Sequence, residues 1–167
     1  MCGGIMLRLF PEEPITLIFK QRSSGVLLHP TSLPGPDGIG DLGPGAFRWI
    51  DFLSDTDTAL WQVLPLNPTG YGDSPYQSFS AFAGNHYMIS SELMLEDGLL
   101  SAEDLADRPD FPTAKVDFGP VIEWKLTLLE RAFKQFQQKG TLKAEVKAFR
   151  ESQGRWLENY ALFMALK

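Results

Sequence analysis

The sequence predicts an α/β fold in which parallel strands are joined by a crossover helix. Two apolar runs, GVLLH at residues 25–29 and LWQVLPL at residues 60–66, contain continuous valine and leucine, which is typical of strands covered on both faces. A segment with helical spacing lies between these runs, and this order of strand, helix and strand implies a parallel pair. A long loop follows each strand, at the carboxyl ends where α/β proteins place their functional residues.

The first connection is predicted to contain a turn-rich loop followed by a helix. Its long loop, HPTSLPGPDGIGDLG at residues 29–43, contains the glycine-rich stretch GPDGIGDLG at residues 35–43, which lacks the glycine patterns of phosphate-binding loops, so we interpret this stretch as turns. His29 ends the strand with its ring expected to face the loops, and we favour a structural role for it over a catalytic one. Gly43 and Pro44 mark a helix start. The apolar face of that helix is predicted to consist of Ala46, Trp49, Ile50 and Leu53.

The second half of the sequence is predicted to be mainly helical. Residues 101–104 resemble a capping box that starts a short helix, and Gly119 with Pro120 opens a longer one. The longer helix has an apolar stripe: Val121, Trp124, Leu128, Ala132 and Phe136. A second stripe follows: Val146, Phe149, Trp156, Leu157, Tyr160 and Met164. We expect these two helices to pair through their stripes across a break at residues 140–141.

The segment TGYGDSPYQSFSAFAGN at residues 69–85, called the aromatic loop below, combines aromatic rings with turn-forming and polar residues. Tyrosine presents a flat apolar face with a hydroxyl at its rim, so Tyr71 and Tyr76 suit contact with a sugar ring. For Phe79 and Phe82, inward packing and ligand contact are equal alternatives. Three nearby polar side chains add hydrogen-bond donors and acceptors: Asp73, Ser74 and Gln77. The loop therefore predicts a polar, ring-shaped ligand.

The composition excludes several classes of protein. The net charge of −6, without any basic cluster, argues against nucleic acid as a partner. Cys2 is the only cysteine, and His29 and His86 lie far apart, so neither a disulfide nor a metal site is predicted. The apolar runs at the start are shorter than a signal peptide, which predicts a cytoplasmic protein without a membrane partner. The acidic residues of the middle segment are interpreted as solvated: Glu92, Glu96, Asp97, Glu103 and Asp104.

Four segments in order carry a resemblance to a known family: GVLLHPTSLPGPDGIGDLG, LWQVLPLNPTGYGDSPYQSFSAFAGN, KVDFG and WLENYALFMALK. Together they resemble the N-terminal part of the 4-alpha-glucanotransferases, also called amylomaltases or disproportionating enzymes. The resemblance covers residues 24–167 and leaves residues 1–23 as an unassigned N-terminal extension. It implies a partial (β/α)8 TIM barrel, with the first two strands, their loops and an inserted helical subdomain. On this basis we expect residues 24–167 to be an incomplete domain and the reading frame to continue.

The resemblance also implies a reaction. Family members transfer a segment of an α-1,4-glucan to the 4-hydroxyl of another glucan or of glucose by a retaining double displacement, without metal or organic cofactor. This chemistry needs a carboxylate nucleophile and a carboxylic acid that serves as acid and then base. The family carries these groups in later barrel segments, so we expect no catalytic residue in this chain and no activity from it alone. The expected partner is maltodextrin, glycogen or starch. The alternative is a non-catalytic glucan-binding or partner-binding protein derived from the barrel.

The substrate contacts implied by the resemblance fall within the aromatic loop. Tyr76 matches a family tyrosine that positions the donor sugar, and Asp73 and Ser74 belong to the same motif. Tyr71 matches an aromatic residue that some members use in a secondary glucan groove. The sequence departs from the family pattern where proline, aspartate and a groove aromatic are common, and the residues there are His86, Ser90 and Ile122. The last departure weakens the expectation of a secondary groove.

Overall fold

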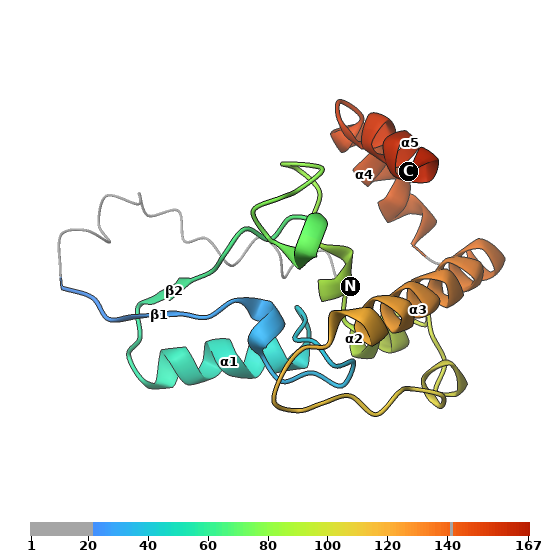
Figure 1. Ribbon diagram of the computed structural model, residues 1–167. Coiled ribbons are helices and arrows are strands. Elements are labelled where there is room, and N and C mark those ends of the chain that lie inside the picture. Colours follow the sequence, from blue (N-terminus) through green and yellow to red (C-terminus); the bar gives the residue numbers. More distant parts are fainter. Residues whose placement is uncertain (1–21, 141) are drawn as a thin grey trace.

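The computed structural model describes residues 22–140 and 142–167 (Figure 1). The predicted N-terminal extension at residues 1–23 lies almost entirely outside the described residues. In chain order the described strands and α-helices are β1 (Gly25–Leu27), α1 (Pro44–Asp55), β2 (Leu60–Gln62), α2 (Ser91–Glu96), α3 (Phe118–Lys139), α4 (Lys143–Gln153) and α5 (Leu157–Leu166). The predicted class, α/β with a helix between two parallel strands, is confirmed.

The sheet consists of β1 and β2, which pair in parallel with Val26 opposite Trp61. Both strands are shorter than the apolar runs predicted. The prediction that they are covered on both faces is wrong for the described residues, because the Leu27 side chain is 58% exposed. A buried strand needs neighbours on both edges and both faces, and the described sheet has these two strands alone.

Helix α1 begins where the sequence predicts. Pro44 occupies its first turn, where the missing N–H leaves no hydrogen bond unmade. The helix ends at Asp55 and is capped by Thr56, whose hydroxyl donates to the Phe52 carbonyl at 2.9 Å. Trp49 connects the helix to the sheet through an edge contact with Trp61, whose indole N–H donates to the Leu28 carbonyl at 2.7 Å. The helix therefore lies along the strand pair, as Figure 1 shows.

The hydrophobic core lies between α2, α3 and the connection between them. Its buried members are Met94, Leu100, Trp124, Leu128 and Ala132. Helix α3 begins at Phe118, so Gly119 and Pro120 lie in its first turn as predicted for a helix start. The predicted stripe is confirmed at four of its five residues, because Val121, Trp124, Leu128 and Ala132 are buried, while Phe136 is half-buried. The helix ends at Gly140, whose φ of 68° is the left-handed conformation that glycine adopts without strain.

The short capping box at Ser101 is also present. The Ser101 amide and hydroxyl both donate to the Asp104 carboxylate, at 2.8 and 2.7 Å, and the Asp104 amide donates back to the Ser101 hydroxyl at 3.3 Å. These bonds hold a single 3-10 turn, Glu103–Leu105, where the sequence predicts a short helix. Asp104 is thus partly buried in this turn, whereas the sequence suggested a solvated carboxylate.

The last predicted stripe forms two helices instead of one, with the break at residues 154–156. The expected pairing of this stripe with α3 is wrong at Trp156, which contacts the aromatic loop, and at Phe149, which is exposed on α4. Phe163, which lies outside the predicted stripe, contacts the same loop. Residues 160–166 of α5 are all apolar or aromatic, so helical periodicity there carries no information about which face is buried.

No helix within the described ranges is long and apolar enough to cross a lipid bilayer.

Candidate functional site

The aromatic loop is closed at its base, directly after the carboxyl end of β2. The Asn67 side-chain amide donates to the Ala83 carbonyl at 3.1 Å, and the Asn85 backbone amide donates to the Leu66 carbonyl at 2.8 Å. These two bonds bring the ends of the segment together, so the intervening residues project from the strand end as a compact loop. A loop in this position is where parallel α/β proteins present ligand-binding side chains.

The tip of the loop is a tight turn that the sequence encodes locally. Asp73 has a φ of 55°, a left-handed conformation that aspartate tolerates better than most residues. Pro75 is the second residue of a turn closed by the Gln77 amide, which donates to the Ser74 carbonyl at 3.2 Å. A Cβ at Gly70 would clash with the Gln77 carbonyl oxygen, so only glycine allows this close approach.

Serine side chains replace the ladder hydrogen bonds that a strand would supply. The Ser74 hydroxyl accepts from the Tyr76 amide at 3.3 Å. The Ser80 hydroxyl accepts from the amides of Phe82 and Ala83 at 3.1 and 3.0 Å. Such side-chain bonds satisfy a backbone that has no sheet or helix partner. The serine content of the loop therefore gives it a defined shape without an aliphatic core.

The predicted contact residues lie together on the tip of this loop. Tyr71 is 89% exposed and Tyr76 is 71% exposed, so both phenol rings are accessible to a ligand. Asp73 and Ser74 lie between them and are half-buried. Four residues that offer ring faces, a carboxylate and a hydroxyl thus share one projection at the end of β2.

Two residues next to the loop were missed by the sequence analysis as part of this surface. Tyr87 follows the loop directly, and burial, followed by the nearby Asp73 carboxylate, raises the pKa of its phenol. The His86 ring lies against it with centroids 4.1 Å apart, and burial lowers the pKa of His86. Both side chains are therefore held in their neutral forms near pH 7. The sequence offered one signal for them, because both residues directly follow Gly84 and Asn85 at the end of the loop.

His29 has the structural role that the sequence favoured. Its Nδ1 accepts from the Thr31 amide at 3.3 Å and so caps the 3-10 turn Pro30–Ser32. Its Nε2 lies 3.4 Å from the Pro65 carbonyl, which joins the carboxyl ends of β1 and β2. The ring thus holds the two loop-bearing strand ends together.

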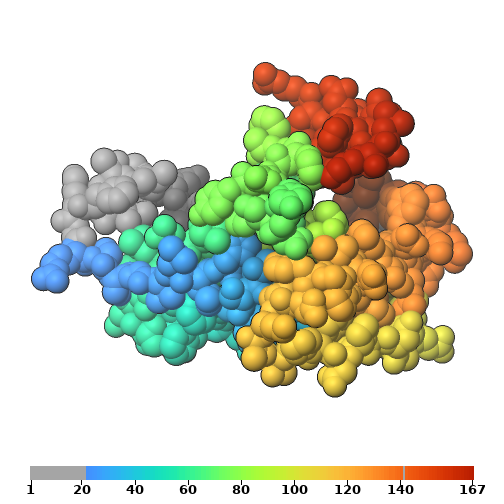
Figure 2. All heavy atoms as spheres, viewed as in Figure 1, coloured from blue at the N-terminus to red at the C-terminus, as the bar shows by residue number. Residues whose placement is uncertain are grey.

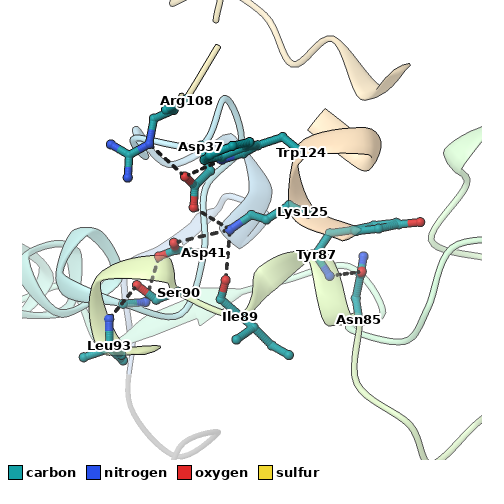
Figure 3. A network of polar contacts seen from close by, with 11 residues as sticks. Asp37, Asp41, Asn85, Tyr87, Ile89, Ser90, Leu93, Arg108, Trp124 and Lys125 are labelled. Atoms are coloured by element: carbon teal, nitrogen blue, oxygen red, sulfur yellow. Dashed lines mark hydrogen bonds and ion pairs between the residues drawn. The ribbon is translucent and has the colours of Figure 1, made fainter. Parts of the chain in front are cut away.

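A buried charge network lies beside the site and connects three segments (Figure 3). The Lys125 ammonium on α3 donates to Asp37 at 2.8 Å and to the Ile89 carbonyl at 2.9 Å. The Trp124 indole N–H donates to the same carboxylate at 3.0 Å, and Arg108 forms an ion pair with it at 3.2 Å. The network therefore joins the loop after β1, the segment that follows the aromatic loop, and α3.

Two carboxylates in this network respond to burial in opposite ways. Burial disfavours the charge of Asp37, but Lys125 and the Trp124 N–H outweigh it and hold its pKa below the ordinary value. Burial raises the pKa of Asp41 above its ordinary value, although Lys125 and the Gly43 amide oppose the change. Neither carboxylate is accessible to a sugar, because Asp37 is 0% and Asp41 4% exposed. Their role is structural.

This network was not predicted from the sequence. Residues 35–43 were correctly interpreted as turns, but nothing local distinguishes their aspartates from solvated ones. The partner Lys125 is 88 residues away from Asp37. The sequence offered one signal that Lys125 is buried, because it directly follows Trp124, which belongs to the predicted apolar stripe of the helix.

Changing Asp41 to asparagine is expected to alter how stability depends on pH. Because the folded pKa of Asp41 is raised, the folded state takes up this proton first, and wild-type stability gains from it as pH falls through that pKa. Asp37 has a lowered pKa and acts in the opposite way. Its ionised carboxylate stabilises the folded state at pH values above its unfolded pKa, and this contribution is lost as pH falls through its folded pKa. Urea unfolding at a series of pH values from about pH 7 to about pH 4 should show that the free energy of unfolding of the wild type rises relative to that of Asp41→Asn as pH falls.

Asp51→Asn is the matched control, since it changes an exposed carboxylate on α1. A stability difference between wild type and Asp41→Asn that stays constant over the same pH range would contradict the assignment. The groups that face Asp41 are Asp37, Glu92 and Lys125.

The fold and the loop together define a class, an α/β protein that presents a polar and aromatic ligand surface at the carboxyl ends of parallel strands. Among the described residues no three histidine, cysteine, aspartate or glutamate side chains are grouped to hold a metal ion. The surface offers ring faces, hydroxyls and one carboxylate, a donor set that suits a carbohydrate.

Comparison with known proteins identifies the family. Residues 28–167 match glycoside hydrolase family 77, described as 4-alpha-glucanotransferase, and the chain belongs to this family. It is 52% identical over 148 residues to the 4-alpha-glucanotransferase of Thermus thermophilus, and 48% identical over 152 residues to that of a Synechocystis species. These alignments cover 87% and 90% of this chain and 29% and 30% of the relatives.

A solved structure is similar over the same region. The amylomaltase from Streptococcus agalactiae, in complex with acarbose, matches with a TM-score of 0.81 and 40% identity over 88% of this chain and 30% of that one. The chain thus spans about 30% of the length of the relatives it matches.

Proposed function

We propose that the protein to which this chain belongs is a 4-alpha-glucanotransferase, which transfers a segment of an α-1,4-glucan to the 4-hydroxyl of an acceptor glucan or glucose. The observation that carries this proposal is the aromatic loop, with two exposed tyrosines at the carboxyl end of β2 in a chain of this family. A bound acarbose in the related amylomaltase supports a glucan-like ligand. The substrates we propose are maltodextrin, glycogen or starch.

In this proposal β1 and β2 are the first two strands of a (β/α)8 barrel, and the helices α2 to α5 belong to an inserted subdomain. The exposed strand faces support this arrangement, because further strands and helices of a barrel would cover them. Residues 24–167 would then be part of one domain. The cytoplasm is the proposed location, on the evidence of a single cysteine in the sequence.

The loop residues have distinct proposed roles. The faces of Tyr76 and Tyr71 lie against C–H faces of glucose rings, while the Tyr76 hydroxyl donates to or accepts from ring hydroxyls. Asp73 and Ser74 hold the turn and offer an acceptor and a donor beside it. A retaining transfer also needs a carboxylate nucleophile and an acid. The buried Asp37 and Asp41 are engaged elsewhere, which supports the view that other segments of the protein supply these groups.

A maltotriose disproportionation assay tests the proposal. The full-length protein is expected to release glucose and form longer maltodextrins, and the 167-residue chain alone is expected to release none. Release of glucose by the chain alone would contradict its assignment as the substrate-contact part only. A full-length protein that transfers nothing would contradict the proposed activity.

The exposure of both tyrosines also suits a second candidate, a non-catalytic glucan-binding protein. Titration of maltoheptaose distinguishes the two. Saturable binding by the chain, abolished in Tyr76→Ala and accompanied by no transfer in the full-length protein, would favour the second candidate.

A further inference from the structure

The aromatic loop contacts a segment far along the chain. Its Phe82 ring stacks on Trp156 with centroids 5.8 Å apart and an interplanar angle of 24°. Its Phe79 ring lies 6.0 Å, centroid to centroid, from the ring of Phe163 on α5. The Lys167 ammonium lies 3.5 Å from the centroid of the Phe79 ring. In Figure 2 the green atoms of the loop region lie directly against the red atoms of α4 and α5.

Trp156 is held in place from its own side of this contact. Its indole N–H donates to the Gln153 side-chain oxygen at 2.8 Å, and its backbone amide donates to the Gln153 carbonyl at 3.1 Å. Its carbonyl accepts from the Tyr160 amide at 3.0 Å, and the Tyr160 ring lies 6.2 Å away. The indole therefore presents a fixed face to Phe82.

The loop side of the contact is fixed by the backbone. The backbone amides of residues 82 and 83 donate to the Ser80 hydroxyl, and these bonds set the direction in which Phe82 leaves the loop. None of residues 79–82, which are two phenylalanines, a serine and an alanine, is buried, so this part of the loop has no core of its own. Aromatic pairs add to area burial through the attraction between ring edges and faces. The rings of residues 156 and 163 are thus the packing surface for this half of the loop.

We infer that Trp156 and Phe163 are positioning residues that hold the aromatic loop, and through it Tyr76, in the orientation that contacts the glucan. The inference rests on the proposed function for the role of Tyr76. Only a few residues of turn separate Tyr76 from Phe79, so a displacement of the phenylalanines moves the tyrosine as well. Small misplacement of a substrate-contact group has large kinetic effects in enzymes.

The test measures both loop order and transfer in the full-length protein. In Trp156→Ala, amide hydrogen exchange over residues 76–85 should become about tenfold faster, because the loop opens more often. The kcat/KM for maltotriose disproportionation should fall about tenfold, mainly through kcat. Trp156→Phe keeps a ring for stacking and should restore both values to within about twofold of wild type. Phe163→Leu, which keeps apolar volume, should show a smaller change in the same direction.

Phe52→Ala is the matched control, since Phe52 is an exposed phenylalanine on α1 whose ring stacks on Trp49. It should change neither readout. Unchanged exchange over residues 76–85 in both Trp156→Ala and Phe163→Leu would overturn the inference, and so would faster exchange with unchanged kcat/KM. A wild-type protein without transfer activity would refute the proposed function, while the exchange rates would still decide whether these rings hold the loop.

Discussion

Replacing Lys125 by methionine is expected to lower the free energy of unfolding by about 3–5 kcal/mol, the range typical of breaking a buried ion pair. The Lys125 side chain is 1% exposed and lies 2.8 Å from the Asp37 carboxylate, which is itself fully buried. Methionine fills a similar volume without charge, so Asp37 loses its closest cation and the Ile89 carbonyl loses its donor. Urea unfolding followed by circular dichroism measures the loss.

The effect depends on a partner left behind, and a double variant tests this. Asp37→Asn with Lys125→Met removes both charges, and we expect it to be less destabilised than the sum of the two single variants. Lys134→Met is the control, because Lys134 is an exposed lysine on the same helix. A loss below about 1 kcal/mol in Lys125→Met, comparable to that of surface substitutions, would show that the network is not essential to the fold.

Replacing Tyr76 by alanine is expected to reduce the kcat/KM of glucan transfer by the full-length protein about 100-fold, the scale of losing a substrate-positioning group. The side chain is 71% exposed, so the free energy of unfolding should change little. Tyr76→Phe separates the two contributions, because it keeps the ring face and removes the hydroxyl. Initial rates of glucose release from maltotriose, with unfolding curves for each variant, provide the measurement.

We expect Tyr76→Phe to keep ring stacking but to lose the hydrogen bond of the phenol hydroxyl. Its kcat/KM should therefore lie between those of wild type and Tyr76→Ala. Phe52→Ala again controls for removal of an exposed ring. Transfer rates in Tyr76→Ala within about twofold of wild type would remove this residue from the proposed site.

The features predicted correctly are those with local causes. The start of α1 follows from Pro44, the end of α3 from Gly140, and the buried face of α3 from residues spaced at helical period. Turns in the aromatic loop follow from its glycines, its proline and its serines. Parallel pairing of the strands follows from the helix between them, because such a connection returns the chain in the same direction.

The features missed or wrong depend on partners distant in the sequence. Asp37 looks like any turn aspartate until α3 brings Lys125 to it. The stripe that ends in α5 was expected to face α3, yet its Trp156 faces the aromatic loop, and so does Phe163 outside the stripe. Burial of the strands was inferred from their valine and leucine content, whereas burial depends on which other segments surround them.

The sequence by itself determined the class of the fold, the order of its elements, the shape of the aromatic loop and the choice of Tyr71, Asp73, Ser74 and Tyr76 as candidate contacts. The first three depend on backbone preferences, turn chemistry or periodicity over a few neighbouring residues, whereas the candidate contacts follow from side-chain chemistry and from the family resemblance. Only the tertiary structure decided which carboxylates are buried, which cation neutralises them and which rings pack on the loop. Those outcomes depend on the loss of water around groups that meet across the fold, and spacing along the chain does not encode that.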